Sequence, residues 1–419
     1  MRTFQLFCCT LLALVLAAGA TPSAQAQDFN IDILHTFTGV PDGSEPAVAL
    51  LIRDPNGNLY GATSGGGDAN CPNAGGGGCG TVYEVAKDGH YTILYSFAGG
   101  SGDGAVPVSG VTRDAAGNLF GTTEGANGAP STIYEIKNTG GEKILHYFLN
   151  FTDGAAANSA PILDAKGNLF GNTMYGGDSS CTYFGPGCGV IYEVKANGTF
   201  LVLYTFTSLK QGGQAIGSPV IDSKGNLFGT TQWGGNFSCN TEVGCGTVYE
   251  LAHTGKYKVL HKFTGKSDGM GPGCVIDDGD GSLVGVTGGG GDLSCDSGLG
   301  CGTIFRIDKT GKLKTLYKFP PFTENNNGHS CLVHDSKGNL YGTNSMGGTN
   351  GSGYLAVLDT AGKYTVLYNF PGANSPQGGI PVGVVLGPNG DFYGVNLFGG
   401  DLNCGLNNTG CGTVFKLTP

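Results

Sequence analysis

Short runs of alternating apolar and polar residues recur along this chain in groups of four. A group opens with a mostly apolar run, AVALLIR (47–53), and continues with GNLYGATS (57–64), GTVYEV (80–85) and TILYSF (92–97). Alternation with a period of two indicates half-buried β-strands, and the glycine-rich segments between the runs indicate turns. The pattern therefore predicts repeated units of four short antiparallel strands.

The second phrase of the group occurs seven times, and this sets the number of units. Its copies begin at residues 57, 117, 167, 225, 281, 338 and 390. The last unit lacks a fourth strand, whereas DILHTF (32–37) at the front of the chain is a fourth strand without a unit. Pairing residues 32–37 with 413–417 would close a ring and remove exposed sheet edges. We therefore predict an all-β fold, a seven-bladed β-propeller with four strands per blade; an open solenoid is the alternative.

The second phrase also carries a family resemblance. The motif D-x-x-G-N-L-[YF]-G-T-T, as in residues 114–123, resembles the tandem repeat named after Gloeobacter and Verrucomicrobia, found in secreted bacterial proteins. It is more distantly similar to the propeller repeats of two-component sensor ectodomains. The resemblance covers the whole chain after residue 26 and implies the propeller architecture, but it implies no activity.

The N-terminus predicts export. Residues 1–26 combine one Arg, an apolar run and the sequence Ala24-Gln25-Ala26, which are the features of a secretory signal peptide. We expect residues 27–419 to form a single propeller domain that is a monomer, secreted or on the cell surface, with the periplasm as an alternative. No second apolar stretch is long enough to span a membrane, so we expect no transmembrane segment. The net charge of −10 argues against a nucleic-acid partner, because phosphate binding needs a basic surface.

Paired cysteines occur in five of the seven loops between the second and third strands, and the other two loops lack both. In an exported chain this pattern favours loop-local disulfides over a metal site or redox catalysis, since zinc would need four ligands. The expected pairs are Cys71–Cys79, Cys181–Cys188, Cys239–Cys245, Cys295–Cys301 and Cys404–Cys411. Cys274 and Cys331 share one register in neighbouring units, and either a bridge between blades or two buried thiols would fit.

An acidic or amide residue stands three positions before the first cysteine of each pair. These residues are Asp68, Asp178, Asn236, Asp292 and Asp401. Such oxygens could bind Ca²⁺, but one side chain per loop is too few, and an Asx turn is the favoured interpretation. We therefore expect no cofactor and no metal, with Ca²⁺ as the alternative.

Further acidic residues occur in the loops that lead from the fourth strand of one unit to the first strand of the next. Because these loops enter the innermost strands, we expect the residues to ring the mouth of the central channel. Their carboxylates could cleave a glycan or hold a cation, and simple turn chemistry is the favoured alternative. The candidates are Asp42, Glu45, Asp103, Asp153 and Asp268.

Aromatic residues near the cysteine loops vary from unit to unit, unlike the repeated scaffold. Such side chains could stack on sugar rings or anchor a protein partner, and packing beneath the loops is the alternative. They are Tyr175, Tyr183, Phe184, Trp233, Phe237 and Phe398. The sequence thus favours a non-catalytic binding or scaffold module whose ligand, a glycan or a protein, binds the face with long loops. The alternative function is an extracellular glycan hydrolase or lyase.

Overall fold

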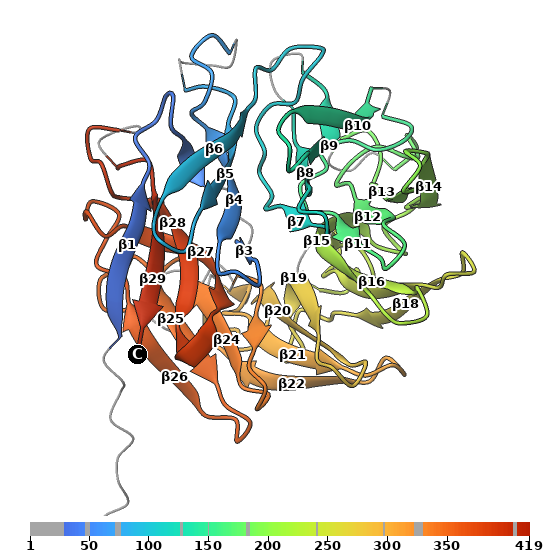
Figure 1. Ribbon diagram of the computed structural model, residues 1–419. Coiled ribbons are helices and arrows are strands. Elements are labelled where there is room, and N and C mark those ends of the chain that lie inside the picture. Colours follow the sequence, from blue (N-terminus) through green and yellow to red (C-terminus); the bar gives the residue numbers. More distant parts are fainter. Residues whose placement is uncertain are drawn as a thin grey trace, which may run out of the picture.

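The computed structural model describes residues 29–419 except 47–50, 72–76, 126–128, 150, 182–184, 240, 241, 296, 297, 322–329 and 405–408. Seven antiparallel sheets form a ring, so the chain is a seven-bladed β-propeller, as predicted (Figure 1). The predicted signal peptide, Tyr183 and Phe184 lie outside the described residues. Within the described part of the chain, no helix has the length and apolarity needed to cross a bilayer.

The blades follow one another along the chain, and each runs from an innermost to an outermost strand. Blades 1 and 2 contain β2 (Ser44–Pro46), β3 (Ile52–Arg53), β4 (Leu59–Gly65), β5 (Thr81–Val85), β6 (Tyr91–Ser96), β7 (Thr112–Arg113), β8 (Leu119–Thr123), β9 (Ser131–Ile136) and β10 (Glu142–Phe148). Blades 3 and 4 contain β11 (Ile162–Leu163), β12 (Leu169–Asn172), β13 (Val190–Val194), β14 (Phe200–Thr205), β15 (Gly213–Ile221), β16 (Leu227–Trp233), β17 (Thr247–Leu251) and β18 (Tyr257–Lys262).

The remaining blades have the same plan. Blades 5 and 6 contain β19 (Met270–Asp277), β20 (Leu283–Gly289), β21 (Thr303–Ile307), β22 (Leu313–Lys318), β23 (Val333–His334), β24 (Leu340–Asn344), β25 (Tyr354–Leu358) and β26 (Tyr364–Asn369). Blade 7 contains β27 (Gly379–Leu386), the short helix η3 (Pro388–Gly390), β28 (Phe392–Phe398), β29 (Thr413–Thr418) and, as its outermost strand, β1 (Asn30–Thr36).

Blade 7 joins the two ends of the chain. β1 pairs antiparallel with β29, from Asn30 opposite Thr418 to Thr36 opposite Thr413 (Figure 1). The N-terminal strand therefore completes a sheet whose other strands come from the C-terminal end. The ring closure predicted from the split unit is confirmed.

The two short turns of a blade lie on one face, where an Asp–Asn pair ties them together. In blade 1, Asp54 Oδ1 accepts the N–H of Asn58 at 2.9 Å, and Asn58 Oδ1 accepts the N–H of Lys87 at 3.2 Å. Gly57 adopts a φ of 99°, which glycine tolerates and other residues disfavour. The two Asp–Asn contacts recur in blades 2, 3, 4 and 6.

A β-bulge interrupts the outermost strand of all seven blades. In blade 1, Tyr95 lies opposite Val82 and Ile93 opposite Tyr83, so Leu94 has no partner. A leucine is skipped in the same way in every other blade. A bulge re-aims the side chains that follow it. Strict alternation along this strand therefore does not predict which face a side chain occupies.

Neighbouring blades pack closely where a glycine meets a proline. Gly246 follows Cys245, and a Cβ added to it would lie 2.3 Å from Pro272 Cδ in blade 5. The Cys245 carbonyl also accepts the N–H of Gly271 at 2.9 Å. The same glycine–proline contact forms at Gly80–Pro107, Gly353–Pro381 and Gly412–Pro46. The proline of the loop between blades is thus explained by packing.

The described residues contain six disulfides. The five predicted loop-local pairs all form. Cys274 and Cys331 form the sixth, with a Cα–Cα distance of 5.5 Å, and link blades 5 and 6. Of the two alternatives left open by the sequence, the bridge between blades is correct.

A matched pair of variants tests the glycine–proline contact. Gly246 and Gly255 have φ values of +89° and +85°, but nothing lies within 4 Å of a Cβ added at Gly255. Both alanines carry the cost of a left-handed backbone, about 1 kcal/mol, and only Gly246→Ala also collides with Pro272 and with the carbonyl oxygens of Thr231 and Gln232. We expect the free energy of urea unfolding to fall by about 1 kcal/mol in Gly255→Ala and by about 3 kcal/mol in Gly246→Ala. Equal losses would contradict this packing.

Candidate functional site

The long loops between the second and third strands lie on the face opposite the Asp–Asn turns. We call the five loop-local disulfides staples, and those of blades 4 and 7 also contact the loop that leads to the next blade. A Cβ at Gly39 would lie 3.1 Å from Cys404 Sγ, and one at Gly265 would lie 2.9 Å from Cys245 Sγ. The disulfides therefore brace both kinds of loop on this face, and they give any ligand a pre-formed surface.

The Asp or Asn three residues before the first cysteine of each staple forms an Asx turn. Asp178 Oδ1 accepts the N–H of Ser180 at 2.9 Å. The same contact forms at Asp68, Asn236, Asp292 and Asp401. Hydrogen bonding from Ser180 lowers the pKa of Asp178. In the described residues, no three His, Cys, Asp or Glu side chains gather as metal ligands. The turn is the role that the observed contacts support.

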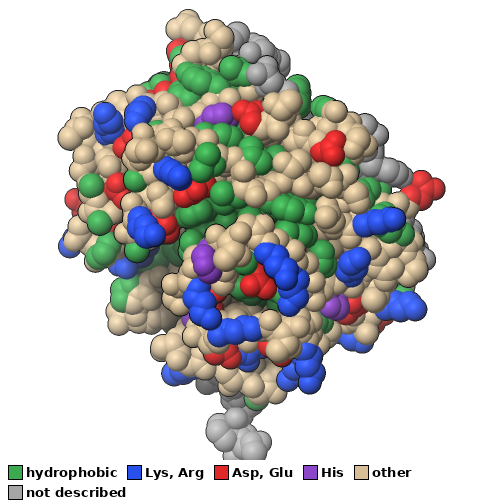
Figure 2. Space-filling model, turned by 90° about the vertical axis from the view of Figure 1, so that its right-hand side faces the viewer, with side chains coloured by type: hydrophobic (Ala, Val, Ile, Leu, Met, Phe, Trp, Pro, Cys, Tyr) green, Lys and Arg blue, Asp and Glu red, His purple; other side chains and the backbone are tan. Residues whose placement is uncertain are grey.

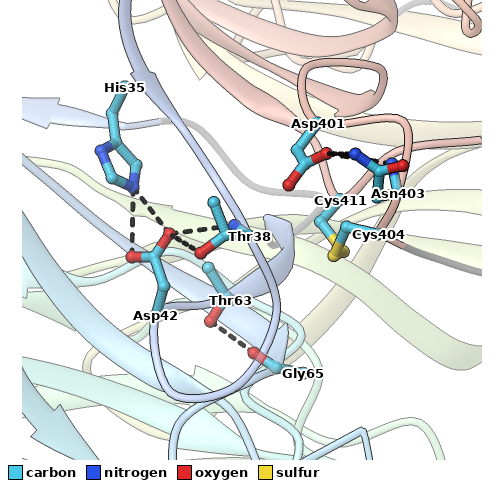
Figure 3. Close-up of a disulfide and its surroundings, with 9 residues drawn as sticks. All are labelled: His35, Thr38, Asp42, Thr63, Gly65, Asp401, Asn403, Cys404 and Cys411. Carbon is cyan, nitrogen blue, oxygen red and sulfur yellow. Dashed lines mark hydrogen bonds and ion pairs between the residues drawn. A yellow bond between two sulfur atoms is a disulfide. The ribbon is translucent and has the colours of Figure 1, made fainter.

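Four of the five acidic residues expected at the channel mouth, all except Glu45, lie instead beside the outermost strands. His35 Nε2 lies 3.1 Å from both carboxylate oxygens of Asp42, and the Thr38 N–H donates to Asp42 Oδ2 at 3.0 Å (Figure 3). The same contact joins His146 to Asp153 at 2.9 Å and His261 to Asp268 at 3.0 Å. The bulge precedes each histidine and turns it toward the loop. The order of the strands had suggested that these carboxylates lie near the innermost strands, whereas they lie at the opposite ends of their loops.

Glu45 is the one candidate of this group at the start of an innermost strand. Its N–H donates to the Cys411 carbonyl at 3.1 Å, and Ser64 Oγ donates to its carboxylate at 3.3 Å. Its φ of 53° is rare for a residue other than glycine. Among the described residues, none of the five acidic candidates is hydrogen-bonded to another. Their catalytic role stays a prediction.

Asp103 alone has a second carboxylate as its neighbour. The Tyr95 hydroxyl lies 3.2 Å from Asp103 Oδ2 and 3.3 Å from Glu142 Oε2 of the next blade. At two equivalent contacts an aromatic ring replaces Glu142, and it stacks on the histidine at 3.6 Å. Burial, together with the charge of Asp103, raises the pKa of Glu142 to about 8. Glu142 therefore keeps its proton at neutral pH.

A cavity of 680 Å³ lies among the innermost strands of blades 1 to 6. Its surface is mostly apolar and includes the Cys274–Cys331 bridge. Glu124 lines it on the long-loop side, after β8, and Asp277 lines it on the turn side, at the end of β19. Glu124 was not among the candidates predicted from the sequence. The sequence does distinguish it, because the equivalent residues of the other blades are all uncharged: Ser64, Met174, Gln232, Gly288, Ser345 and Leu397.

The predicted aromatic residues are not gathered in one place. Tyr175, Trp233 and Phe398 share one register in blades 3, 4 and 7 and are half-buried. Phe237, in the staple loop of blade 4, is 45% exposed. Phe237 is therefore the described candidate that is most available to a ligand.

Phe237 lines a hollow of 380 Å³ between blades 3 and 4. The other lining residues are Ser180, Cys181, Thr207, Ser208, Leu209, Lys210 and Glu242. An exposed ring thus lies beside hydroxyl, ammonium and carboxylate groups. Phe237 was predicted from the sequence, but its neighbours in the hollow were not. The sequence marks this loop as unusual, because Gln211 replaces the Asp found in most of the equivalent loops. Gln211 accepts a hydrogen bond from Thr207 Oγ1 at 3.2 Å.

The comparison with protein families agrees with the repeat. The model of the Gloeobacter/Verrucomicrobia repeat matches residues 19–185, 129–327 and 293–419. No curated protein sequence matches the chain. Because the three matched ranges overlap, the family model extends over the entire propeller.

Solved structures share the architecture. Streptogramin B lyase has a TM-score of 0.57 at 12% identity, covering 93% of this chain and 98% of that one. The extracellular domain of a hybrid two-component system from B. thetaiotaomicron has 0.53 at 14%, covering 92% of this chain and 41% of that one. A fungal alcohol oxidase of the AA5 family, in complex with copper, has 0.53 at 13%, covering 94% and 76%. At these identities the likeness shows the fold alone.

Replacing Glu142 should change how stability depends on pH. The pKa of this carboxyl is about 8 in the folded chain, against an ordinary value of 4.5. The folded chain keeps a proton that the unfolded chain releases, so this contribution is full below the lower pKa and is lost as pH rises through the higher one. We expect Glu142→Gln to gain melting temperature relative to wild type from about pH 5 to about pH 8.5 by calorimetry. Glu135→Gln, in the neighbouring strand, controls for the loss of one charge. A difference that is constant with pH would contradict the shift.

Proposed function

The chain belongs to the Gloeobacter/Verrucomicrobia repeat family, and from this premise and the geometry of its long loops we propose that it is an exported, non-catalytic module that binds glycans. The observation that carries the proposal is Phe237. Its exposed ring borders a hollow that also presents hydroxyl groups and charges of both signs.

This combination matches the chemistry of a sugar. A pyranose ring has an apolar face of C–H groups, which stacks on aromatic rings, and a periphery of hydroxyl groups that need hydrogen-bond partners. Phe237 would provide the stacking surface. Ser208 and Lys210 would donate hydrogen bonds, and Glu242 would accept them. The bound unit would lie between the loops of blades 3 and 4.

Export is supported by the disulfides and by the N-terminal sequence. Six disulfides are typical of an oxidising compartment, and residues 1–26 have the features of a signal peptide. One structural neighbour is the extracellular domain of a two-component system. We propose that the protein is secreted or on the cell surface, where polymeric glycans are available.

Glycan cleavage has less support. Asp42, Asp103 and Asp268 each cap a backbone N–H in their own loops. Asp103 and Glu142 share Tyr95, but neither lines the cavity or the hollow described above. A general acid must reach the bond that it protonates. The carboxylates are therefore better explained as parts of the scaffold.

Loss of the Phe237 ring should weaken binding without unfolding the protein. Among oligosaccharides that bind the purified protein on a glycan array, we expect Phe237→Ala to raise the Kd about tenfold, as measured by titration calorimetry. Phe237→Trp should retain binding, because it keeps a stacking surface. Val366→Ala removes another exposed apolar side chain, from an outer strand, and should have no effect.

Two results would overturn the proposal. One is a wild-type protein that binds no glycan on the array. The other is a glycan that binds wild type and Phe237→Ala equally well, which would place its site elsewhere. A protein ligand recovered in either case would support the alternative partner.

A further inference from the structure

The outer edges of blades 4 and 5 concentrate lysine in a chain whose net charge is −10. Residues 253–268 and 308–319 each contain four lysines and a single aspartate. In the other blades, the outermost strand and the turn before it contain at most two basic residues. We name this set the lysine face: Lys256, Lys258, Lys262, Lys266, Lys309, Lys312, Lys314 and Lys318.

The charges of the lysine face are open to solvent. All eight side chains are exposed, and none of the ion pairs between described residues includes them. Acidic residues nearby offset part of this charge. Asp268 is bonded to His261, and Asp308 accepts the N–H groups of Thr310 and Lys312 in its turn and lies near the Lys312 charge. Glu250 lies opposite Lys258 in the sheet, Asp292 lies near Lys318, and Lys309 lies beside Gly281, which follows Asp280. Asp280 is paired with Arg306, so the lysine face keeps a positive excess.

The two lysine-bearing edges are in contact with each other. Thr315 Oγ1 of blade 5 donates to the Ser267 carbonyl of blade 4 at 3.0 Å. A Cβ added at Gly311 would lie 2.6 Å from the Leu260 carbonyl oxygen, so the turn of blade 5 touches the bulge of blade 4. Figure 2 views the molecule from the side of β14 and β18, and lysine and arginine side chains gather over its lower part.

Protection of sheet edges does not account for this concentration. Lysine on an outermost strand does discourage pairing with another chain. Yet β6 and β14 are outermost strands of the same length and carry no charged residue. Blades that need equal protection therefore lack it, and the lysines of blades 4 and 5 require another explanation.

We propose that the lysine face binds an acidic polysaccharide, a polymer whose sugar carboxylates match a row of ammonium groups. Lys258 and Lys262 lie opposite Glu250 and Thr247, so the bulge between them leaves them about 10 Å apart along the sheet, and successive charges would contact different units of an extended polymer. Ammonium groups act as mobile point charges and suit a repeated anion better than one fixed ligand. Within a Debye length of about 10 Å the local excess outweighs the charge of the whole chain.

Other polyanions fit less well. Tyr257 and Tyr317 are stacked between blades, on Tyr204 at 4.0 Å and Tyr364 at 4.5 Å, so they offer no platform for nucleic-acid bases. None of the exposed large apolar residues in the described chain lies in residues 253–268 or 308–319, and membrane insertion would need them. The lysine face lies on the outer side of the ring and does not share residues with the Phe237 hollow. It is therefore independent of the proposed function.

The test uses the full mature protein and defined polymers. Polygalacturonate carries a carboxylate on each sugar, and dextran is the uncharged control. We expect polygalacturonate to bind at low ionic strength and salt to weaken it, with no binding of dextran, as measured by biolayer interferometry. The variant Lys258→Gln/Lys262→Gln/Lys314→Gln/Lys318→Gln should raise the Kd by about tenfold or more. Phe237→Ala should leave this binding unchanged.

A charge-matched variant makes the result specific. Lys87→Gln/Lys166→Gln/Lys224→Gln/Lys337→Gln removes four exposed lysines from turns of blades 1, 3, 4 and 6 and should change the Kd less than twofold. Equal weakening by both variants would overturn the proposal, as would tighter binding to duplex DNA or to phosphatidylglycerol vesicles. Self-association of the first variant with unchanged polymer affinity would show edge protection instead. Circular dichroism confirms folding, and Lys314→Gln/Lys318→Gln repeats the test if the larger variant unfolds.

Discussion

The pairing of β1 with β29 is the constraint on which the rest of the structure depends. It forces seven sheets to share one closed circle, so every blade must meet its neighbours at the same angle and spacing. The repeated sequence motifs provide the contacts that this regular spacing requires. Glycine after the second cysteine admits the proline of the next blade, and the cysteine carbonyl binds the first N–H groups of its innermost strand. Residues that look like turn chemistry in one unit therefore serve contacts between units.

Closure also separates structural from functional positions. A residue that recurs at one register in most blades, such as Asp54 or Gly246, has a partner that recurs with it. Departures from the repeat need another explanation. Glu142 replaces a stacked ring, Phe237 stands exposed in a staple loop, and lysines collect on two neighbouring edges. These three departures from the repeat lie on different parts of the propeller.

The architecture could be read from the sequence because each unit repeats the same local information seven times. The number of blades, the ring closure and the five staples all followed from spacing. The placement of Asp42 did not, because the bulge at Leu34 depends on pairing between strands and leaves no mark in the alternation. Neither the hollow beside Phe237 nor the lysine face was predicted from the sequence, since each combines residues of two blades that are distant in sequence.

We propose above all that a braced long-loop face binds a glycan without altering it. A crystal structure of the protein with its tightest-binding oligosaccharide tests this most directly. We predict an intact sugar ring stacked on Phe237, with its hydroxyl groups bonded to Ser208 and Lys210. A ligand cleaved in the crystal, or one seated in the cavity beside Glu124 with the Phe237 hollow empty, would contradict it.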